Sequence, residues 1–159
     1  MEKIASFTVN HIDLEPGVYV SRRDMVGAEP VTTFDIRMTS PNDEPVMDTA
    51  AVHCLEHLGA TFLRNDPEWG SRTVYFGPMG CRTGFYLVAA GELEAADIID
   101  VLTRFFTWAS EFDGPVPGAA PSDCGNWLDI NLPMARWEAA RYLERCLCGI
   151  DEEHMVYPA

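Results

Sequence analysis

The stretch His53-Cys54-Leu55-Glu56-His57-Leu58 constrains this 159-residue chain more than any other part of it. If residues 46–65 are helical, with about 100° of rotation per residue, His53 and His57 lie one turn apart on the same face, with Glu56 beside them. Apolar side chains fall on roughly the opposite side, so the helix can bury one stripe and present its imidazoles on the other. This spacing suits one bound cation.

The order H-x-x-E-H occurs in inverted zinc peptidases and reverses the commoner H-E-x-x-H. The alternative is a pair of histidines on a solvated helix face, and a third ligand from elsewhere would decide between the two. Cys124 is a candidate because it follows a turn-rich loop and precedes Gly125, which lets the backbone approach an ion. Two histidines, a cysteine and one open position are typical of a catalytic metal site, whereas structural sites use four protein ligands. The alternative for Cys124 is a half-buried free thiol.

Cys81 lies in the glycine-rich stretch P-M-G-C-R-T-G of residues 78–84, near the tip of a predicted hairpin. Glycines permit unusual backbone angles there, and the neighbouring Arg82 would favour a thiolate. A thiolate can act as a nucleophile or as a base. The alternative for Cys81 is an inert cysteine in a turn.

The chain has five cysteines, an odd number without an evident disulfide framework, so free thiols or metal ligands are favoured over bridges. Cys54 lies about 100° round the helix from His53 and is expected to pack in the core. Cys146 and Cys148 point to different faces near the end of the last predicted helix, and both are interpreted as structural.

The length and net charge of the chain limit its domain organisation and the classes of function it can have. A chain of 159 residues and 17.7 kDa is the size of one domain, residues 1–159, with a sizeable core. Eleven basic against 25 acidic residues give a net charge of -14, which disfavours binding to nucleic acid or to a membrane surface. The N-terminus lacks the features of a secretion signal, and no stretch approaches the roughly 18 apolar residues of a membrane span. We therefore expect a cytosolic protein.

Local patterns predict two β-hairpins and a set of helices. Apolar and polar residues alternate over residues 31–40, as in a half-buried strand, and the connection 24–30 is too short for a crossover helix. The remaining expected strands are residues 17–23, 72–76 and 83–90. Expected helices are residues 46–65 with Asp48 as N-cap, 92–112, and 133–147 with Asn131 as cap. The fold class expected is α+β, with an antiparallel sheet of about four strands from two hairpins covered by three to four helices.

Five pieces of the sequence occur together in a characteristic order. They are Ser6-Phe7 with His11, Phe34-Asp35-Ile36-Arg37 with Pro41-Asn42, His53 to Leu58, the run Gly77 to Tyr86 (G-P-M-G-C-R-T-G-F-Y), and Cys124-Gly125-Asn126. In order and spacing they resemble the S-ribosylhomocysteine lyase family, which makes autoinducer-2. The resemblance covers nearly the whole chain, and the run around Cys81 is its most specific part.

The resemblance implies a homodimer with two equivalent sites at the subunit interface. It also implies one metal ion per subunit, iron(II) in the native form, with zinc or cobalt able to substitute. Matched by motif, the metal ligands would be His53, His57 and Cys124, the acid/base pair Cys81 and Glu56, and the substrate-binding residues Ser6, His11 and Arg37.

The same resemblance implies the reaction. S-ribosylhomocysteine would give homocysteine and 4,5-dihydroxy-2,3-pentanedione, the autoinducer-2 precursor, by carbonyl migration through enediolates followed by β-elimination. A divalent ion would act as a Lewis acid toward the sugar oxygens, while Cys81 and Glu56 move protons. The alternatives are an H-x-x-E-H metallopeptidase, in which Glu56 activates a water, and a non-catalytic metal-binding protein.

Three positions depart from the family pattern. Cys54 stands where threonine is frequent and Asp123 where glutamate is common, and neither change is expected to matter much. Tyr75 lies six residues before Cys81, where many members carry an aspartate that contacts the sugar, so we expect that contact to be absent or replaced.

Overall fold

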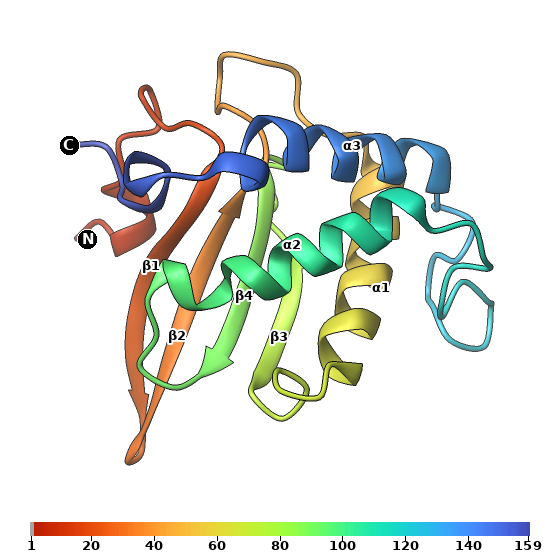
Figure 1. The fold of residues 1–159 in the computed structure, drawn as a ribbon, viewed down its shortest axis with the longest axis horizontal. Helices are drawn as coiled ribbons and strands as arrows, with labels where there is room; N and C mark the ends of the chain where they lie inside the picture. Colours follow the sequence, from red (N-terminus) through yellow and green to blue (C-terminus); the bar gives the residue numbers. More distant parts are fainter. Residues whose placement is uncertain (1) are drawn as a thin grey trace.

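The structure is a computed structural model that describes residues 2–159. It contains a four-stranded antiparallel sheet of order β1-β2-β4-β3, three α-helices and three short 3-10 turns (Figure 1). The strands are β1 (Gly17–Val26), β2 (Glu29–Arg37), β3 (Thr73–Pro78) and β4 (Gly84–Ala90), and the helices are α1 (Thr49–Asn65), α2 (Ala95–Glu111) and α3 (Leu132–Arg145). The 3-10 turns are Ala5–Phe7, Leu147–Gly149 and Glu152–Met155. The expected α+β class is confirmed.

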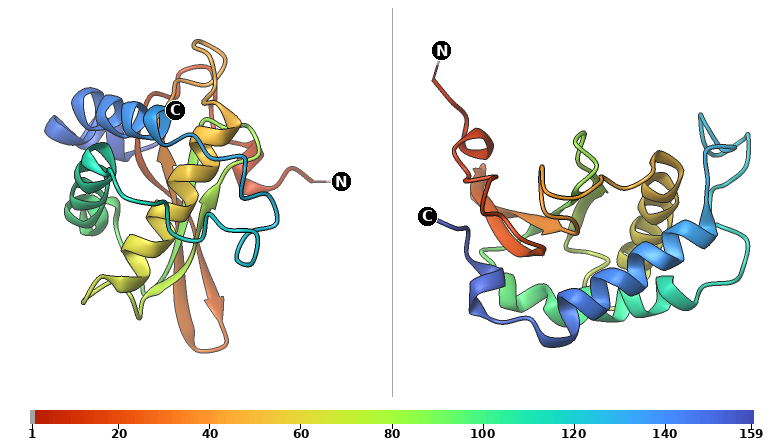
Figure 2. Two further views of the ribbon diagram at one scale, coloured as in Figure 1. Left: turned by 90° about the vertical axis from the view of Figure 1, so that its right-hand side faces the viewer. Right: turned by 90° about the horizontal axis from the view of Figure 1, so that it is seen from above.

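The helices lie to one side of the sheet. Helices α2 and α3 run side by side beneath it, and α1 stands next to the β3 edge (Figures 1 and 2). Among the described residues no α-helix covers the opposite face, which we call the open face (Figure 2). Side-chain burial along β4 differs between the two faces. Phe85 and Leu87 face the helices and are fully buried, whereas Tyr86 and Val88 on the open face are only half-buried.

The core is built by apolar side chains that face each other across neighbouring strands. Phe34 of β2 is opposite Leu87, and Ile36 is opposite Phe85. Phe85 in turn stacks on Phe76 of β3, with ring centroids 5.0 Å apart. One hydrophobic core extends from these strands to all three helices, which holds the sheet and helices at fixed relative positions.

Several element ends differ by a few residues from those expected, and two of these differences have a clear local cause. Strand β1 continues to Val26 because the hairpin turn has only two residues, with Gly27 at φ 65°. Helix α2 begins at Ala95 rather than near residue 92 because the Asp97 side chain accepts from the Glu94 amide and caps the helix there. Helix α3 ends at Arg145 rather than residue 147.

Helix α1 carries the histidines and begins at Thr49 rather than residue 46, directly after Asp48, the residue expected to cap it. The Asp48 side chain accepts hydrogen bonds from the amides of Ala50 and Ala51, which satisfies two of the free donors at the helix start. Leu55 and Leu58 are fully buried on one face. The opposite stripe, with both histidines, is only half-buried, so the predicted amphipathic arrangement is confirmed.

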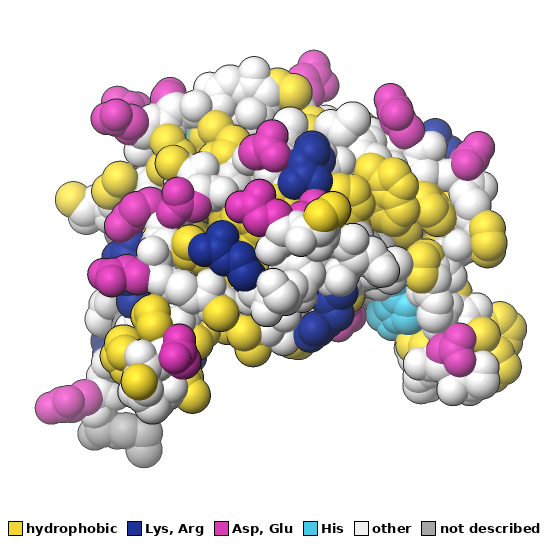
Figure 3. All heavy atoms as spheres, turned by 60° about the horizontal axis from the view of Figure 1, so that its bottom comes forward, with side chains coloured by type: hydrophobic (Ala, Val, Ile, Leu, Met, Phe, Trp, Pro, Cys, Tyr) yellow, Lys and Arg dark blue, Asp and Glu magenta, His cyan; other side chains and the backbone are white. Residues whose placement is uncertain are grey.

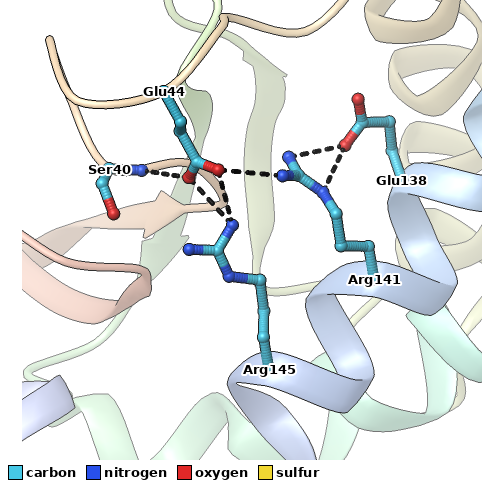
Figure 4. Close-up of polar contacts among 5 residues, drawn as sticks. All are labelled: Ser40, Glu44, Glu138, Arg141 and Arg145. Carbon is cyan, nitrogen blue, oxygen red and sulfur yellow. Dashed lines mark hydrogen bonds and ion pairs between the residues drawn. The ribbon is translucent and has the colours of Figure 1, made fainter.

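The loop between β2 and α1 is attached to α3 by an ionic cluster (Figure 4). Glu44 accepts from Arg141 at 3.0 Å, from Arg145 at 2.8 Å and from the Ser40 amide at 2.6 Å. Arg141 also contacts Glu138 at 2.9 Å, so one guanidinium lies between two carboxylates. The cluster fixes the segment that leads into the histidine helix.

One face of the surface shows how its acidic residues are distributed. Acidic side chains are scattered over the surface in Figure 3 and form no single patch there. In the part of the chain that the structure describes, no helix is both long enough and apolar enough to cross a membrane.

Candidate active site

The structure brings together the three side chains that the sequence suggested as metal ligands. One ligand atom from each of His53, His57 and Cys124 lies within 4.8 Å of the others, and all three residues are half-buried. The two Nε2 atoms are 3.0 Å apart, and the Cys124 sulfur is 3.4 Å from the Nε2 of His53. Helix α1 supplies the histidines, and the loop after α2 supplies the cysteine from 71 residues away from His53.

That loop also holds the imidazole rings. The Nδ1 atom of His53 lies 2.9 Å from the carbonyl oxygen of Asp129, and that of His57 lies 2.7 Å from the carbonyl oxygen of Pro117. A carbonyl oxygen can only accept, so each Nδ1 must carry the proton. The lone pair of each neutral ring is therefore on Nε2, the atom that faces Cys124.

This tautomer makes the site complementary to a cation. Two unprotonated Nε2 atoms only 3.0 Å apart direct their lone pairs at one another, which is unfavourable unless a positive charge lies between or beside them. The sulfur of Cys124 adds a third donor that suits the same kind of ion. Two imidazoles and a thiolate leave one position free on a four-coordinate ion, so the residues present fit a catalytic divalent metal.

A glycine in the loop permits this arrangement. Gly118 has φ 70°, a conformation that residues with a side chain rarely adopt, and a Cβ there would lie 3.0 Å from the Nδ1 of His57. The preceding residue, Pro117, can therefore bring its carbonyl onto the ring. Sequence reasoning missed Pro117, Gly118 and Asp129, and the only local signal was the dense proline and glycine content of residues 113–121.

Cys81 lies in a second cluster, at the hairpin between β3 and β4. Its side chain is exposed, and its sulfur is 3.0 Å from the Thr83 hydroxyl oxygen. That oxygen is 2.5 Å from Nη1 of Arg37, whose other terminal nitrogen pairs with Asp35 at 2.5 Å. Arg82, expected beside the thiol, donates instead to the carbonyl of Met47.

The pair Arg37 and Asp35 is almost fully buried, with 3% and 2% of the side chains exposed. The pKa of the Asp35 carboxyl is raised, because the effect of burial exceeds the opposing effects of Arg37 and of the Tyr157 hydroxyl, which donates at 2.9 Å. Burial lowers the pKa of Arg37, but Asp35 raises it more, and the guanidinium keeps its charge. His11 is half-buried and close enough to Asp35 to act on that carboxyl electrostatically.

The other two expected residues, Glu56 and Ser6, belong to different elements. Glu56 is half-buried on α1, one residue before His57. Ser6 lines a cavity of about 270 Å³ on the open face, together with Tyr75 and Tyr86. Within residues 2–159 no hydrogen bond or ion pair joins the cluster at Cys81 to the metal triad.

Comparison with known proteins gives a consistent result. The family described as S-Ribosylhomocysteinase (LuxS) matches residues 4–153. The S-ribosylhomocysteine lyase of Clostridium acetobutylicum is 58% identical over 158 residues, which is 99% of each chain. That of Clostridium beijerinckii is 56% identical with the same coverage, and that of Phocaeicola vulgatus is 52% identical over 99% of this chain and 98% of its own.

Proposed function

This chain belongs to the S-ribosylhomocysteinase (LuxS) family, and from that premise we propose that it cleaves S-ribosylhomocysteine. The products would be homocysteine and 4,5-dihydroxy-2,3-pentanedione, the precursor of autoinducer-2. The observation that carries the proposal is the convergence of His53, His57 and Cys124 in a chain more than half identical to proteins named as this lyase. A thiolate as third ligand argues against the metallopeptidase alternative.

His53, His57 and Cys124 would hold one divalent ion per chain, which we propose to be iron(II), replaceable by zinc or cobalt. When bound, such an ion supplies Lewis-acid stabilisation of negative charge on a sugar oxygen. The protein's own contribution is to keep both histidines in the tautomer with a free Nε2, through the carbonyls of Pro117 and Asp129.

We assign the proton transfers to Cys81 and Glu56. The Cys81 thiolate would take a proton from one sugar carbon and return it to the neighbouring carbon, so that the carbonyl moves along the chain through an enediolate. Once the carbonyl is placed for elimination, loss of a carbon-bound proton lets the carbon–sulfur bond break. Its electron pair leaves with sulfur, which takes a proton to give homocysteine. Glu56, beside His57 on α1, would move protons among the hydroxyl groups and assist this last step.

Ser6, His11 and Arg37 are proposed to bind the substrate. Asp35 forms an ion pair with Arg37 at the end of β2, next to the hairpin that carries Cys81. Ser6 already lines a cavity of about 270 Å³, in which Tyr75 stands where many family members have aspartate. These contacts support a sugar-binding role for the surface between β2, β4 and the N-terminal segment.

We further propose a homodimer in which each copy is a single domain of residues 1–159 that works in the cytosol, without a nucleic-acid or membrane partner. The open face supports the dimer, because it carries exposed apolar side chains: Ile4 is 59% and Tyr75 49% exposed. Among the described residues no hydrogen bond or ion pair connects the Cys81 cluster to the metal triad, which also supports a dimer, since a second copy would bring complementary residues to each site.

The test is homocysteine release from S-ribosylhomocysteine by protein purified without air. Thiol release should disappear on chelation and return on addition of iron(II). Recovery of thiol release with iron(II) but not with magnesium would also support two imidazoles and a thiolate as the ligands, because magnesium prefers oxygen ligands. A folded protein that binds iron(II) and releases no thiol would overturn the proposed activity, and peptide hydrolysis by the same protein would favour the metallopeptidase.

A further inference from the structure

A chain of hydrogen bonds leads from the last residues of the protein to the Cys81 sulfur. Tyr157 donates to Asp35 at 2.9 Å, Asp35 pairs with Arg37 at 2.5 Å, Arg37 reaches the Thr83 hydroxyl at 2.5 Å, and that hydroxyl is 3.0 Å from the sulfur. These hydrogen bonds connect the C-terminal segment, β2 and the start of β4. Neither Thr83 nor Tyr157 was singled out by the sequence motifs.

The chemistry of each group decides which one donates in these hydrogen bonds. A guanidinium has only donors, so the Thr83 oxygen must accept from Arg37. The hydroxyl group then has its single hydrogen left to give, and the sulfur of Cys81 is the acceptor within reach. A thiolate at Cys81 therefore receives a hydrogen bond from a hydroxyl that the positive charge of Arg37 polarises.

The backbone keeps Thr83 in place independently of its side chain. Its carbonyl oxygen accepts from the amides of Met38 at 2.9 Å and Thr39 at 3.1 Å, just after the end of β2. Thr83 is 4% exposed, so water does not compete effectively for its hydroxyl. A substitution that changes only the side chain leaves these backbone contacts available.

We propose that Thr83 is a positioning residue that conveys the effect of Arg37 to Cys81, by donating its hydroxyl hydrogen to the thiolate. Arg37 makes no direct hydrogen bond to the sulfur among the described residues, so the effect passes through the threonine. The inference rests on the proposed role of Cys81 as the base. It adds a requirement for a hydroxyl group at residue 83.

The first test is alkylation of Cys81 by iodoacetamide, in which the sulfur forms a bond to carbon and iodide leaves. Metal-loaded protein in a Cys148→Ser background avoids reaction at the other exposed cysteine. Thr83→Val keeps the volume and removes the hydroxyl, while Thr83→Ser keeps the hydroxyl and removes the methyl. At pH 7 we expect Thr83→Val to react about tenfold more slowly and Thr83→Ser to react within about twofold of the parent.

Two outcomes would overturn the proposal. Equal rates for Thr83→Val and the parent would mean that Arg37 acts on Cys81 without the threonine. A Thr83→Ser protein as slow as Thr83→Val would mean that the methyl group, and therefore packing, is what matters. If Thr83→Val does not fold, as judged by circular dichroism, Thr83→Ala replaces it as the variant without a hydroxyl, with the same expectation.

The second test measures homocysteine release by the same proteins. We expect kcat to fall about tenfold in Thr83→Val and to be restored in Thr83→Ser, with KM nearly unchanged, because the hydroxyl acts on the base. A parent protein that releases no homocysteine would refute the proposed function, whereas the alkylation rates would still decide the role of Thr83. An unchanged kcat in Thr83→Val would refute the role of Thr83 in an active enzyme.

Discussion

Glu56 is the residue whose role is decided most directly by a single isosteric change. It lies on the half-buried face of α1 beside His57, so it could serve as a proton carrier or as a fourth ligand. We expect Glu56→Gln to lower homocysteine release by at least about 100-fold, because an amide cannot exchange protons at neutral pH. The metal content, measured by mass spectrometry of the purified protein, should remain one ion per chain.

The matched control for this change is Glu111→Gln, at the exposed end of α2. It removes the same charge far along the chain from the histidines and should leave both turnover and metal content unchanged. Loss of the metal in Glu56→Gln would instead identify Glu56 as a ligand, and would remove it from the proposed acid/base pair.

Gly118 offers a test of how the loop orients His57. Gly118→Ala would force a side chain into φ 70° and place its Cβ 3.0 Å from Nδ1 of the histidine, so the carbonyl of Pro117 must move off the ring. Loss of a contact that orients a metal-bound histidine typically weakens metal binding by about 10- to 100-fold. Competition with a chromophoric chelator would measure this affinity.

Gly149→Ala serves as the comparison for Gly118→Ala. A Cβ at Gly149 meets no described atom within 4 Å, and its φ lies outside the left-handed region. Metal affinity should be unaffected there. Equal affinities for the two alanine variants would show that the Pro117 carbonyl is not needed to orient His57.

At the scale of elements, the ionic cluster at Glu44 predicts a dependence of stability on pH. Burial raises the pKa of Glu44, but hydrogen bonds from Arg145 and the Ser40 amide, with the charges of both arginines, lower it further, so the net shift is downward. A depressed pKa stabilises the fold above the unfolded value of 4.5, and this contribution is lost as pH falls through the folded pKa. Because Glu44 is partly exposed, we expect about 1 kcal/mol at pH 7.

Urea unfolding of Glu44→Gln and the parent at pH 7 and pH 3 would measure this contribution. The parent should be more stable by about 1 kcal/mol at pH 7, and the difference should shrink at pH 3. Glu144→Gln, at an exposed position of α3, the helix that carries Arg141 and Arg145, is the control for the loss of one charge and should show a smaller difference. A difference between Glu44→Gln and the parent that stays constant with pH would contradict the assignment.

The elements themselves were largely readable from the sequence because their signals are local. Asp48 and Asn131 were recognised as caps, and both accept from the amides expected of an N-cap. The spacing of His53 and His57 pointed to two of the three side chains that converge in the structure. These features involve residues within one helical turn of each other, where periodicity and residue preference carry the information.

The contacts that complete the site were not readable, because they join residues far apart in the chain. Asp129 and Pro117 reach the histidines over 76 and 60 residues, and Tyr157 reaches Asp35 over 122. A backbone carbonyl has no residue type to recognise, and a tyrosine in a terminal segment has no periodicity. The family resemblance supplied Arg37, and the glycine-rich hairpin pointed to Cys81, but only the structure shows that the Thr83 hydroxyl lies between them.

At the scale of the whole molecule, the open face of the sheet predicts how two copies meet. Val88 lies on this face, opposite Tyr75 of β3, and lines the same cavity as Ser6. If the face forms the dimer interface, Val88→Asp would bury a charge without a partner, at a cost of several kcal/mol. A cost of about 3 kcal/mol already weakens dimerisation more than 100-fold.

Sedimentation equilibrium should therefore find the parent as a dimer of 17.7 kDa chains and Val88→Asp as a monomer. Val26→Asp, the same change at a 65% exposed residue at the tip of the β1–β2 hairpin, should remain dimeric. Because the site is proposed to need both copies, homocysteine release by Val88→Asp should rise with protein concentration as dimers re-form. A parent that is monomeric, or a Val88→Asp protein as dimeric as Val26→Asp, would exclude this face as the interface.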